Sequence, residues 1–301
     1  MGSEFIERSI DHLSIRFEDT YHDVMTTTGQ GLVCAIGEIR FSNESTSFAD
    51  GVLNIHVNGD PTKFQISDQS FGQTFVKAVA LSDLSSGLGR IGSEPQEGPG
   101  ETVVIVLMDC NMPDSTLARA GITATEAVTA AIQDLGLRYG GVRPSGSNKQ
   151  HILTIRNRDS TLFLNNAGKH SKLGELIGST VIAAVKDSAA ANGTDINTRR
   201  SIVGMLSGYG CTQDDLQKLS GCPDPSTFLV KVITKDSDYN ALLTVSAVLH
   251  IHDNVASGLF PEAEGLKAAQ DVLRAGLREP VGFGSILDVL FNTVAFYFMD
   301  P

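Results

Sequence analysis

Apolar and polar residues alternate along the first third of the chain. In residues 13–17, Leu-Ser-Ile-Arg-Phe, every second side chain is apolar. Because successive side chains of a strand point to opposite faces of a sheet, this period of two predicts strands with one buried face. Segments of this kind lie within residues 6–24, 31–39 and 51–57. The first third is therefore predicted to be rich in β-strands.

The middle of the chain mixes longer apolar runs with helical spacing. The continuous apolar run at residues 102–109 predicts a central strand covered on both faces. Thr123 and Glu126 have the capping-box spacing, so a helix is predicted to begin at Thr123. The helices predicted here are 71–84, 123–135 and 173–190. Two further strands, at 151–156 and 161–164, are predicted around a turn at 157–159.

The spacing of apolar residues in the last hundred positions is typical of helices. Helices are predicted at 198–209, 212–220, 239–258 and 261–277. The sequence Pro-Asp-Pro at 223–225 breaks this series. Residues 281–299 are strongly apolar but contain Asp288 and Asn292, which disfavours a membrane span and indicates a buried helix or an oligomer contact.

These patterns together predict an α/β or α+β fold, with a mixed sheet core, covering helices and a helical C-terminal extension. Residues 1–5 are interpreted as a cloning scar, because Gly-Ser-Glu-Phe is a peptide that common restriction sites encode. We expect residues 6–193 to form the core domain that carries the site. Residues 194–301 are expected to form a helical extension packed on that core.

Composition narrows the partners. The 301 residues are 41% hydrophobic and carry a net charge of -12 with no basic run, which disfavours nucleic acid and anionic membranes. The four cysteines show no CxxC spacing, and this indicates reduced thiols in a cytoplasmic protein. Glu18, Asp19 and Asp23 near two histidines are typical of a solvated face.

Two short patterns invite a cofactor or a metal. Residues 87–92 match the three-glycine dinucleotide pattern, but no apolar strand precedes them and no helix can follow, so a loop is predicted. His250 and His252 lie two apart on a predicted helix and point in different directions. Neither a metal nor a cofactor is predicted.

The strongest candidate for chemistry is the polar turn at residues 165–171. Asn165 and Asn166 follow a predicted strand as candidate substrate-binding residues. Lys169 supplies a cation and His170 a group that carries a proton near neutral pH, while Glu175 lies one turn into the next helix.

A simpler interpretation of this turn stays open. Ser171 would cap the helix, Glu175 would pair with Lys172, and Lys169 and His170 would face solvent.

Two other clusters are candidates for substrate binding. Asp109, Cys110 and Asn111 follow the central strand, where the carboxyl ends of strands line ligand crevices in α/β sheets. A turn with a buried thiol is the favoured alternative for that cluster. The second cluster precedes the strand at 151–156, and its small polar side chains either line a pocket or turn the chain: Ser145, Ser147 and Asn148.

Residues 167–178, Ala-Gly-Lys-His-Ser-Lys-Leu-Gly-Glu-Leu-Ile-Gly, resemble the closing segment of the adenosylcobinamide amidohydrolases. In that family a Gly-Thr-x-Thr-Asp strand comes earlier, and here residues 145–150 occupy its place without the Thr and Asp. The family's early Asn-His element has an echo at Asn54 and His56. The resemblance extends over residues 30–190 and is strongest over 145–190.

The resemblance implies hydrolysis of the amide that joins aminopropanol to the corrin periphery, as in corrinoid salvage, with the corrinoid as substrate. Such a reaction needs a proton carrier, an oxyanion donor and activated water. His170 could move the proton, Lys169 or helix N–H groups could hold the oxyanion, and Glu175 or Asp109 could activate water.

Two alternatives belong to other classes. The first is a non-catalytic protein that binds a small metabolite in the same turn and the glycine-rich loops. The second is a structural subunit that docks a partner, or forms a homo-oligomer, through residues 281–299.

Overall fold

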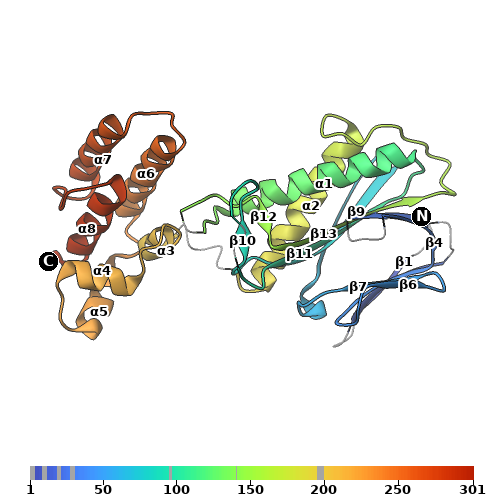
Figure 1. Ribbon diagram of the computed structural model, residues 1–301, viewed down its shortest axis with the longest axis horizontal. Coiled ribbons are helices and arrows are strands. Elements are labelled where there is room, and N and C mark those ends of the chain that lie inside the picture. The colour runs from blue at the N-terminus through green and yellow to red at the C-terminus, as the bar shows by residue number, and fades with distance from the viewer. Residues whose placement is uncertain are drawn as a thin grey trace. The chain divides into compact units, whose positions relative to one another are not determined.

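The computed structural model describes residues 4–8, 12–18, 22–27, 31–94, 97–139, 141–194 and 200–301. The chain forms two compact units (Figure 1), of which the first comprises Met1–Leu137 and Arg143–Asp195 and the second Arg138–Val142 and Ile196–Pro301. The chain therefore passes between the units three times. Nothing in the sequence pattern indicates that residues 138–142 belong with the helical unit. The packing of the extension on the core stays a prediction.

The first unit contains two main sheets and two long helices. Its strands are β1 (Glu4–Arg8), β2 (His12–Phe17), β3 (His22–Thr26), β4 (Leu32–Ile36), β5 (Glu38–Ser42), β6 (Ser47–Ala49), β7 (Val52–His56), β8 (Gln65–Phe71), β9 (Thr74–Asp83), β10 (Leu88–Gly89), β11 (Glu101–Met108), β12 (Gly146–Ser147) and β13 (Lys149–Asn157). Its helices are the short 3-10 helix η1 (Pro61–Lys63), α1 (Asp114–Leu135) and α2 (Lys172–Ala191). Glu4 and Phe5, which the scar interpretation sets aside, begin β1 and pair with β2.

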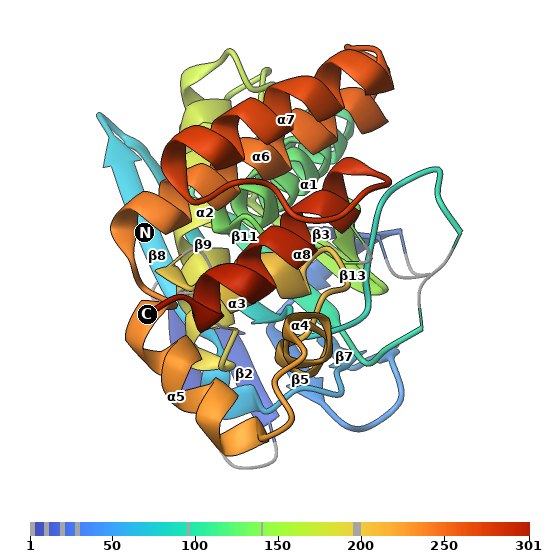
Figure 2. The ribbon, with the colours of Figure 1, turned by 90° about the vertical axis from the view of Figure 1, so that its left-hand side faces the viewer.

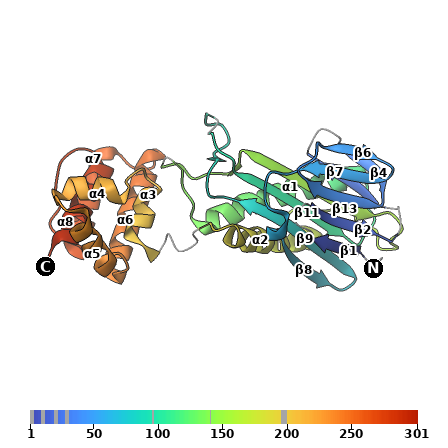
Figure 3. The same cartoon turned by 90° about the horizontal axis from the view of Figure 1, so that it is seen from below.

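The first unit is built in three layers (Figure 3). A six-stranded sheet in the order β4-β3-β13-β11-β9-β8 lies in the middle. Helices α1 and α2 cover one face, and a five-stranded sheet in the order β1-β2-β5-β7-β6 covers the other. Within the central sheet, β11 and β13 run parallel and are joined through α1. The fold is therefore α+β with mixed sheets, as the sequence predicts.

Both faces of β11 are buried, which confirms the predicted central strand. Val104, Val106 and Met108 pack against α1 and α2. The alternate residues, from Val103 to Leu107, pack against the second sheet. A strand covered on both faces needs apolar side chains at every position, so the alternating pattern disappears.

Two predicted elements are wrong. Residues 71–84 were expected to be helical, but residues 74–83 form β9, which pairs with β8 and β11. Like β11, this strand buries apolar side chains on both faces, and such a run does not distinguish a strand from a helix. Residues 161–164 form no strand, and Phe163 makes an isolated bridge with Asn111.

Helix α1 begins nine residues earlier than predicted, at Asp114. Thr123 is not its cap. This residue is buried in the middle of the helix, and its hydroxyl donates a hydrogen bond to the Ala167 carbonyl at 2.8 Å. The capping-box spacing of Thr123 and Glu126 therefore lies inside a longer helix and does not mark its start.

The second unit is helical, as predicted for this part of the chain. It contains α3 (Ile202–Ser207), α4 (Gln213–Ser220), α5 (Pro225–Lys235), α6 (Tyr239–Ala256), α7 (Glu262–Gly276) and α8 (Ile286–Met299). Predicted residues 198 and 199 lie outside the described residues. Helix α5 follows Asp224, whose carboxylate accepts N–H groups from Ser226 and Thr227, so Pro225 begins a helix where we expected a break.

Helix α8 is the core of this unit. It contacts α4, α5, α6 and α7 (Figure 2), and it buries Val289, Leu290, Val294 and Phe298. The buried-helix interpretation of the apolar C-terminal run is therefore correct. Within the described part of the chain, no helix combines the length and apolarity that crossing a membrane requires.

Candidate functional site

The turn at residues 165–171 lies along α1. Thr116 of α1 donates its hydroxyl hydrogen to the Asn165 carbonyl at 3.0 Å, and Thr123 does the same for Ala167. Ser171 then caps α2, its Oγ accepting the Gly174 N–H at 3.0 Å. The turn is thus fixed by three hydroxyl side chains.

The charged side chains of this turn are exposed and engage ordinary surface partners. Lys169 Nζ lies 3.4 Å from Glu126 of α1, and Lys172 Nζ lies 2.6 Å from Glu175. His170 is also exposed. These are the contacts of the simpler interpretation, with the difference that Lys169 has a carboxylate partner. The catalytic roles of Lys169, His170 and Glu175 stay predictions.

A close approach of backbone holds the turn against α2. A Cβ atom added at Gly174 would lie 2.0 Å from the Gly168 carbonyl oxygen. Gly178, one turn further along the same helix, has no atom within 4 Å of the corresponding position. The glycine at 174 is therefore required by packing, whereas that at 178 is not.

We expect Gly174→Ala to lower the free energy of unfolding by about 1–3 kcal/mol, because the turn must move away from α2. Gly178→Ala is the matched control, and it should raise stability by up to about 1 kcal/mol, since alanine favours helix over glycine. Urea unfolding of both variants measures this difference. Equal effects at the two positions would contradict the assigned packing.

The residues after β11 are held inside the carboxyl edge of the sheet. Asn157 of β13 donates to Asp109 Oδ1 at 3.1 Å. Cys110 is fully buried, and burial together with the Asp109 charge raises the pKa of its thiol to about 12. Asn111 donates to the Arg158 carbonyl and accepts the Met112 N–H. Cys110 is thus a buried thiol, as the favoured alternative states, and a thiolate nucleophile is not available there.

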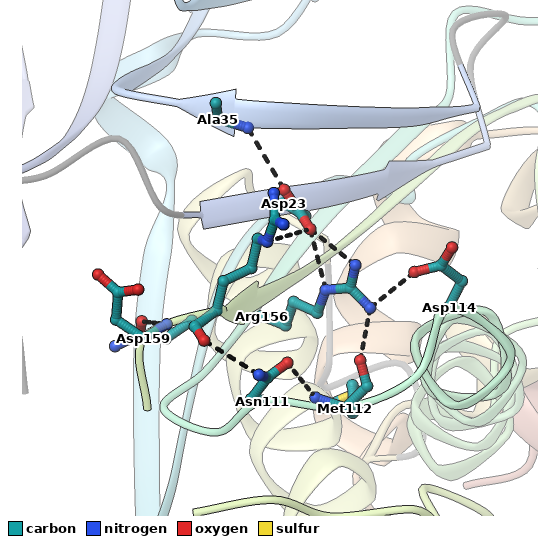
Figure 4. A network of polar contacts seen from close by, with 9 residues as sticks. Asp23, Ala35, Asn111, Met112, Asp114, Arg156 and Asp159 are labelled. Carbon is teal, nitrogen blue, oxygen red and sulfur yellow. Dashed lines mark hydrogen bonds and ion pairs between the residues drawn. The ribbon is translucent and has the colours of Figure 1, made fainter. Parts of the chain in front are cut away.

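Beside this edge lies an ion-pair network that the sequence did not indicate (Figure 4). Asp23 of β3 is fully buried, so the predicted solvated face is wrong at this residue. Glu18 is exposed as predicted, and Asp19 lies outside the described residues. Its Oδ2 accepts two hydrogen bonds from Arg156, at 3.1 and 2.7 Å, and lies 3.6 Å from Arg158 Nε. Arg156 also contacts Asp114 at 2.7 Å. The network ties β3, β13 and the start of α1 together.

Loss of the buried cation should be costly. We expect Arg156→Met to lower the free energy of unfolding by about 3–5 kcal/mol, because Asp23 would remain buried without its main partner. Arg16 also pairs with two carboxylates but is half exposed, so Arg16→Met should cost less than about 1 kcal/mol. Denaturant unfolding followed through the first unit tests both. A similar small loss for the two variants would show that the buried network contributes little.

The third predicted cluster, formed by Ser145, Ser147 and Asn148, lies at the opposite end of the sheet. β11 and β13 pair from Glu101 with Lys149 to Met108 with Arg156. Seven steps of roughly 3.3 Å separate the two ends by about 23 Å. Ser145, Ser147 and Asn148 precede β13 and therefore lie far from the cluster of residues 109–111. The predicted substrate-binding residues do not line one small pocket.

The described parts of the glycine-rich stretch, residues 87–94 and 97–100, lie near this same amino end. β10 pairs with β12, and the Asn148 N–H donates to the Gly87 carbonyl at 2.8 Å. A Cβ atom at Gly100 would lie 2.0 Å from the Ser86 carbonyl oxygen, so the loop segments are closely packed. Within residues 87–92, Leu88 and Gly89 form the short strand β10 and the other residues lie in turns or irregular structure, so the predicted loop is only partly correct.

Metal ligands do not gather in the described residues. No group of three or more His, Cys, Asp or Glu side chains there is placed to hold an ion. His250 and His252 both lie on α6, as expected from the helical spacing.

Comparison with known proteins supports the resemblance. Residues 50–196, which lie almost entirely in the α+β unit, match the family described as adenosylcobinamide amidohydrolase. An uncharacterized protein of Methanocaldococcus jannaschii is 32% identical over 94 residues. That similarity covers 30% of this chain and 36% of the relative, so the chain spans about a third of that protein's length.

Proposed function

We propose that the first unit hydrolyses an amide bond on a corrinoid such as adenosylcobinamide, or on a similarly bulky small molecule. The observation that carries this proposal is the family match over residues 50–196. The matched span contains all three clusters described above, at the two ends of the central strands and along α1. It also contains the segments that carry the resemblance, from Asn54 to residue 178.

The chemistry requires a proton carrier and activated water near the amide. The sequence analysis predicts His170 as the proton carrier, Lys169 or helix N–H groups as the oxyanion donor, and Glu175 or Asp109 as the group that activates water. In the structure Glu175 pairs with Lys172, and Asp109 accepts a hydrogen bond from Asn157. Because Glu175 and Asp109 both have protein partners, their catalytic roles stay predictions. The activity can be tested without knowing which residue carries the proton.

Incubation of the full chain with adenosylcobinamide should release one equivalent of aminopropanol for each corrinoid acid formed. Chromatography of the corrinoid and derivatisation of the amine measure the two products independently. Heat-denatured protein is the control for spontaneous hydrolysis. Absence of both products would contradict the proposal.

A binding protein is the second candidate, and the ion pairs of Lys169 and Lys172 favour it by engaging charges that a hydrolase would use. Corrin colour that accompanies the protein through gel filtration, without amine release, would identify it. Deletion of residues 281–301 is not a useful test of the docking alternative, because α8 forms the core of the helical unit.

A further inference from the structure

A second cluster of polar side chains, separate from the Asp23–Arg156 network, lies at the amino ends of β11 and β13. It is on the face that meets the five-stranded sheet. Glu101 pairs with Lys149 and Val103 pairs with His151 in the parallel register. Val103 belongs to the core between the two sheets, and side chains alternate along a strand. Glu101 and His151 therefore project toward the same side, as diagonal neighbours on adjacent strands.

Glu101 is a buried carboxylate with firm backbone partners. It is 2% exposed, and its Oε2 accepts the N–H groups of Asn58 and Gly59 at 2.9 and 3.1 Å. A Cβ atom at Gly59 would lie 2.5 Å from the Leu81 side chain, so a larger residue there would have to displace that buried side chain. The carboxylate is thus held in one place.

Asn58 extends this group to a second histidine. Its Nδ2 lies 3.4 Å from Glu101 Oε1, and its Oδ1 lies 3.3 Å from Nε2 of His56. His56 ends β7 in the five-stranded sheet. Polar groups from both sheets therefore meet at this end of the unit.

His151 is the member of the group with an unsatisfied atom. Its Nδ1 is buried and has no hydrogen-bond partner among the described residues, which is unfavourable for a polar atom. A buried polar atom of this kind calls for a ligand or water that completes it. Burial lowers the pKa of His151 below its usual value. The Glu101 charge opposes this effect without cancelling it, and Lys149 and His56 lower the pKa further. The imidazole is accordingly neutral at pH 7 and able to accept a proton.

Small polar side chains border the same end. Ser147 Oγ lies 2.9 Å from Thr102 Oγ1, next to Glu101 on β11. Asn148 Nδ2 donates to the Gly98 carbonyl at 3.3 Å, which places its amide at the glycine-rich loop. Because Thr102 and Glu101 are adjacent along β11, Thr102 and Ser147 lie on the face toward the helices, opposite to Glu101 and His151. Three segments, residues 56–59, 98–102 and 147–151, thus meet at the amino ends of β11 and β13.

We propose that this end of the sheet is the reaction centre for the amide hydrolysis proposed above, on which this inference rests. His151 carries the proton, and Glu101 is the positioning residue that acts on it through its charge. The proton carrier is then placed at the amino end of β13 instead of in the turn at residues 165–171.

The step balances with water as the only co-reactant. His151 accepts a proton as the water oxygen bonds to the amide carbon. The C–N bond then breaks, and the proton passes from His151 to the amine nitrogen. This transfer leaves a carboxylic acid and a neutral amine, and His151 returns to its neutral form. The acid then loses its remaining proton to the amine through water, so the products are a carboxylate and a protonated amine.

The test compares four variants of the full chain with adenosylcobinamide as substrate: His151→Gln, Glu101→Gln, His170→Gln and the exposed control His250→Gln. We expect His151→Gln to lower kcat by at least about 100-fold while the protein still retains corrin colour in gel filtration. His250→Gln should match the wild type. Thermal melting of each variant establishes that it is folded.

A pH profile separates a chemical role from a structural one. The wild-type kcat/KM should fall on the acid side as His151 becomes protonated. Because the Glu101 charge raises the pKa of His151, Glu101→Gln should move this acid limb to lower pH. An acid limb that stays in place would overturn the role of Glu101, and it provides a readout even if His151→Gln folds poorly.

Full turnover by folded His151→Gln would overturn the inference and leave the proposed function intact. Retained turnover in that variant together with its loss in His170→Gln would return the proton to the turn at residues 165–171. Absence of turnover by the wild type is seen before any variant is made, and it would remove the proposed function and this inference with it.

Discussion

Burial of both faces of β11 is the constraint on which the first unit depends. All eight residues of this strand are buried between the helices and the second sheet. The strand therefore offers no polar group to solvent along its length, and chemistry can be placed only at its ends. Because β13 runs parallel to it through the α1 crossover, the like ends of the two strands coincide. Loops from distant parts of the sequence are thereby brought together at two edges about 23 Å apart.

The same burial explains how far the fold could be predicted. Amphipathic elements such as α2 and α6 have a regular polar face, so their period identifies them from the sequence alone. In β9 that signal is lost, because Val76, Ala78 and Leu81 face cores on opposite sides of the sheet. The start of α1 was missed for a related reason. Thr123 resembles a cap in sequence, but its hydroxyl serves the Ala167 carbonyl, 44 residues further along the chain.

The polar sites depend even more on contacts between distant residues. Asp23 lies in a locally acidic segment, and only Arg156, 133 positions away, explains why it is buried. Glu101 opens an apolar strand, and its partners come from the loop after β7. Spacing within one segment carries no trace of such pairs. The turn at residues 165–171 attracted attention because its polar residues are adjacent in sequence, yet adjacency there produces a capped helix and two surface ion pairs.

The two buried carboxylates differ in what surrounds them, and the difference bears on function. Asp23 pairs with two guanidinium groups and accepts the Ala35 N–H, so this carboxylate has a full set of protein partners without a ligand. A fully satisfied network of this kind rigidifies the fold. Glu101 accepts hydrogen bonds from backbone N–H groups. The neighbouring His151 has a buried nitrogen that forms no hydrogen bond with the described residues. An enzyme must leave some polar capacity for its substrate, and at the amino edge the Nδ1 atom of His151 retains it.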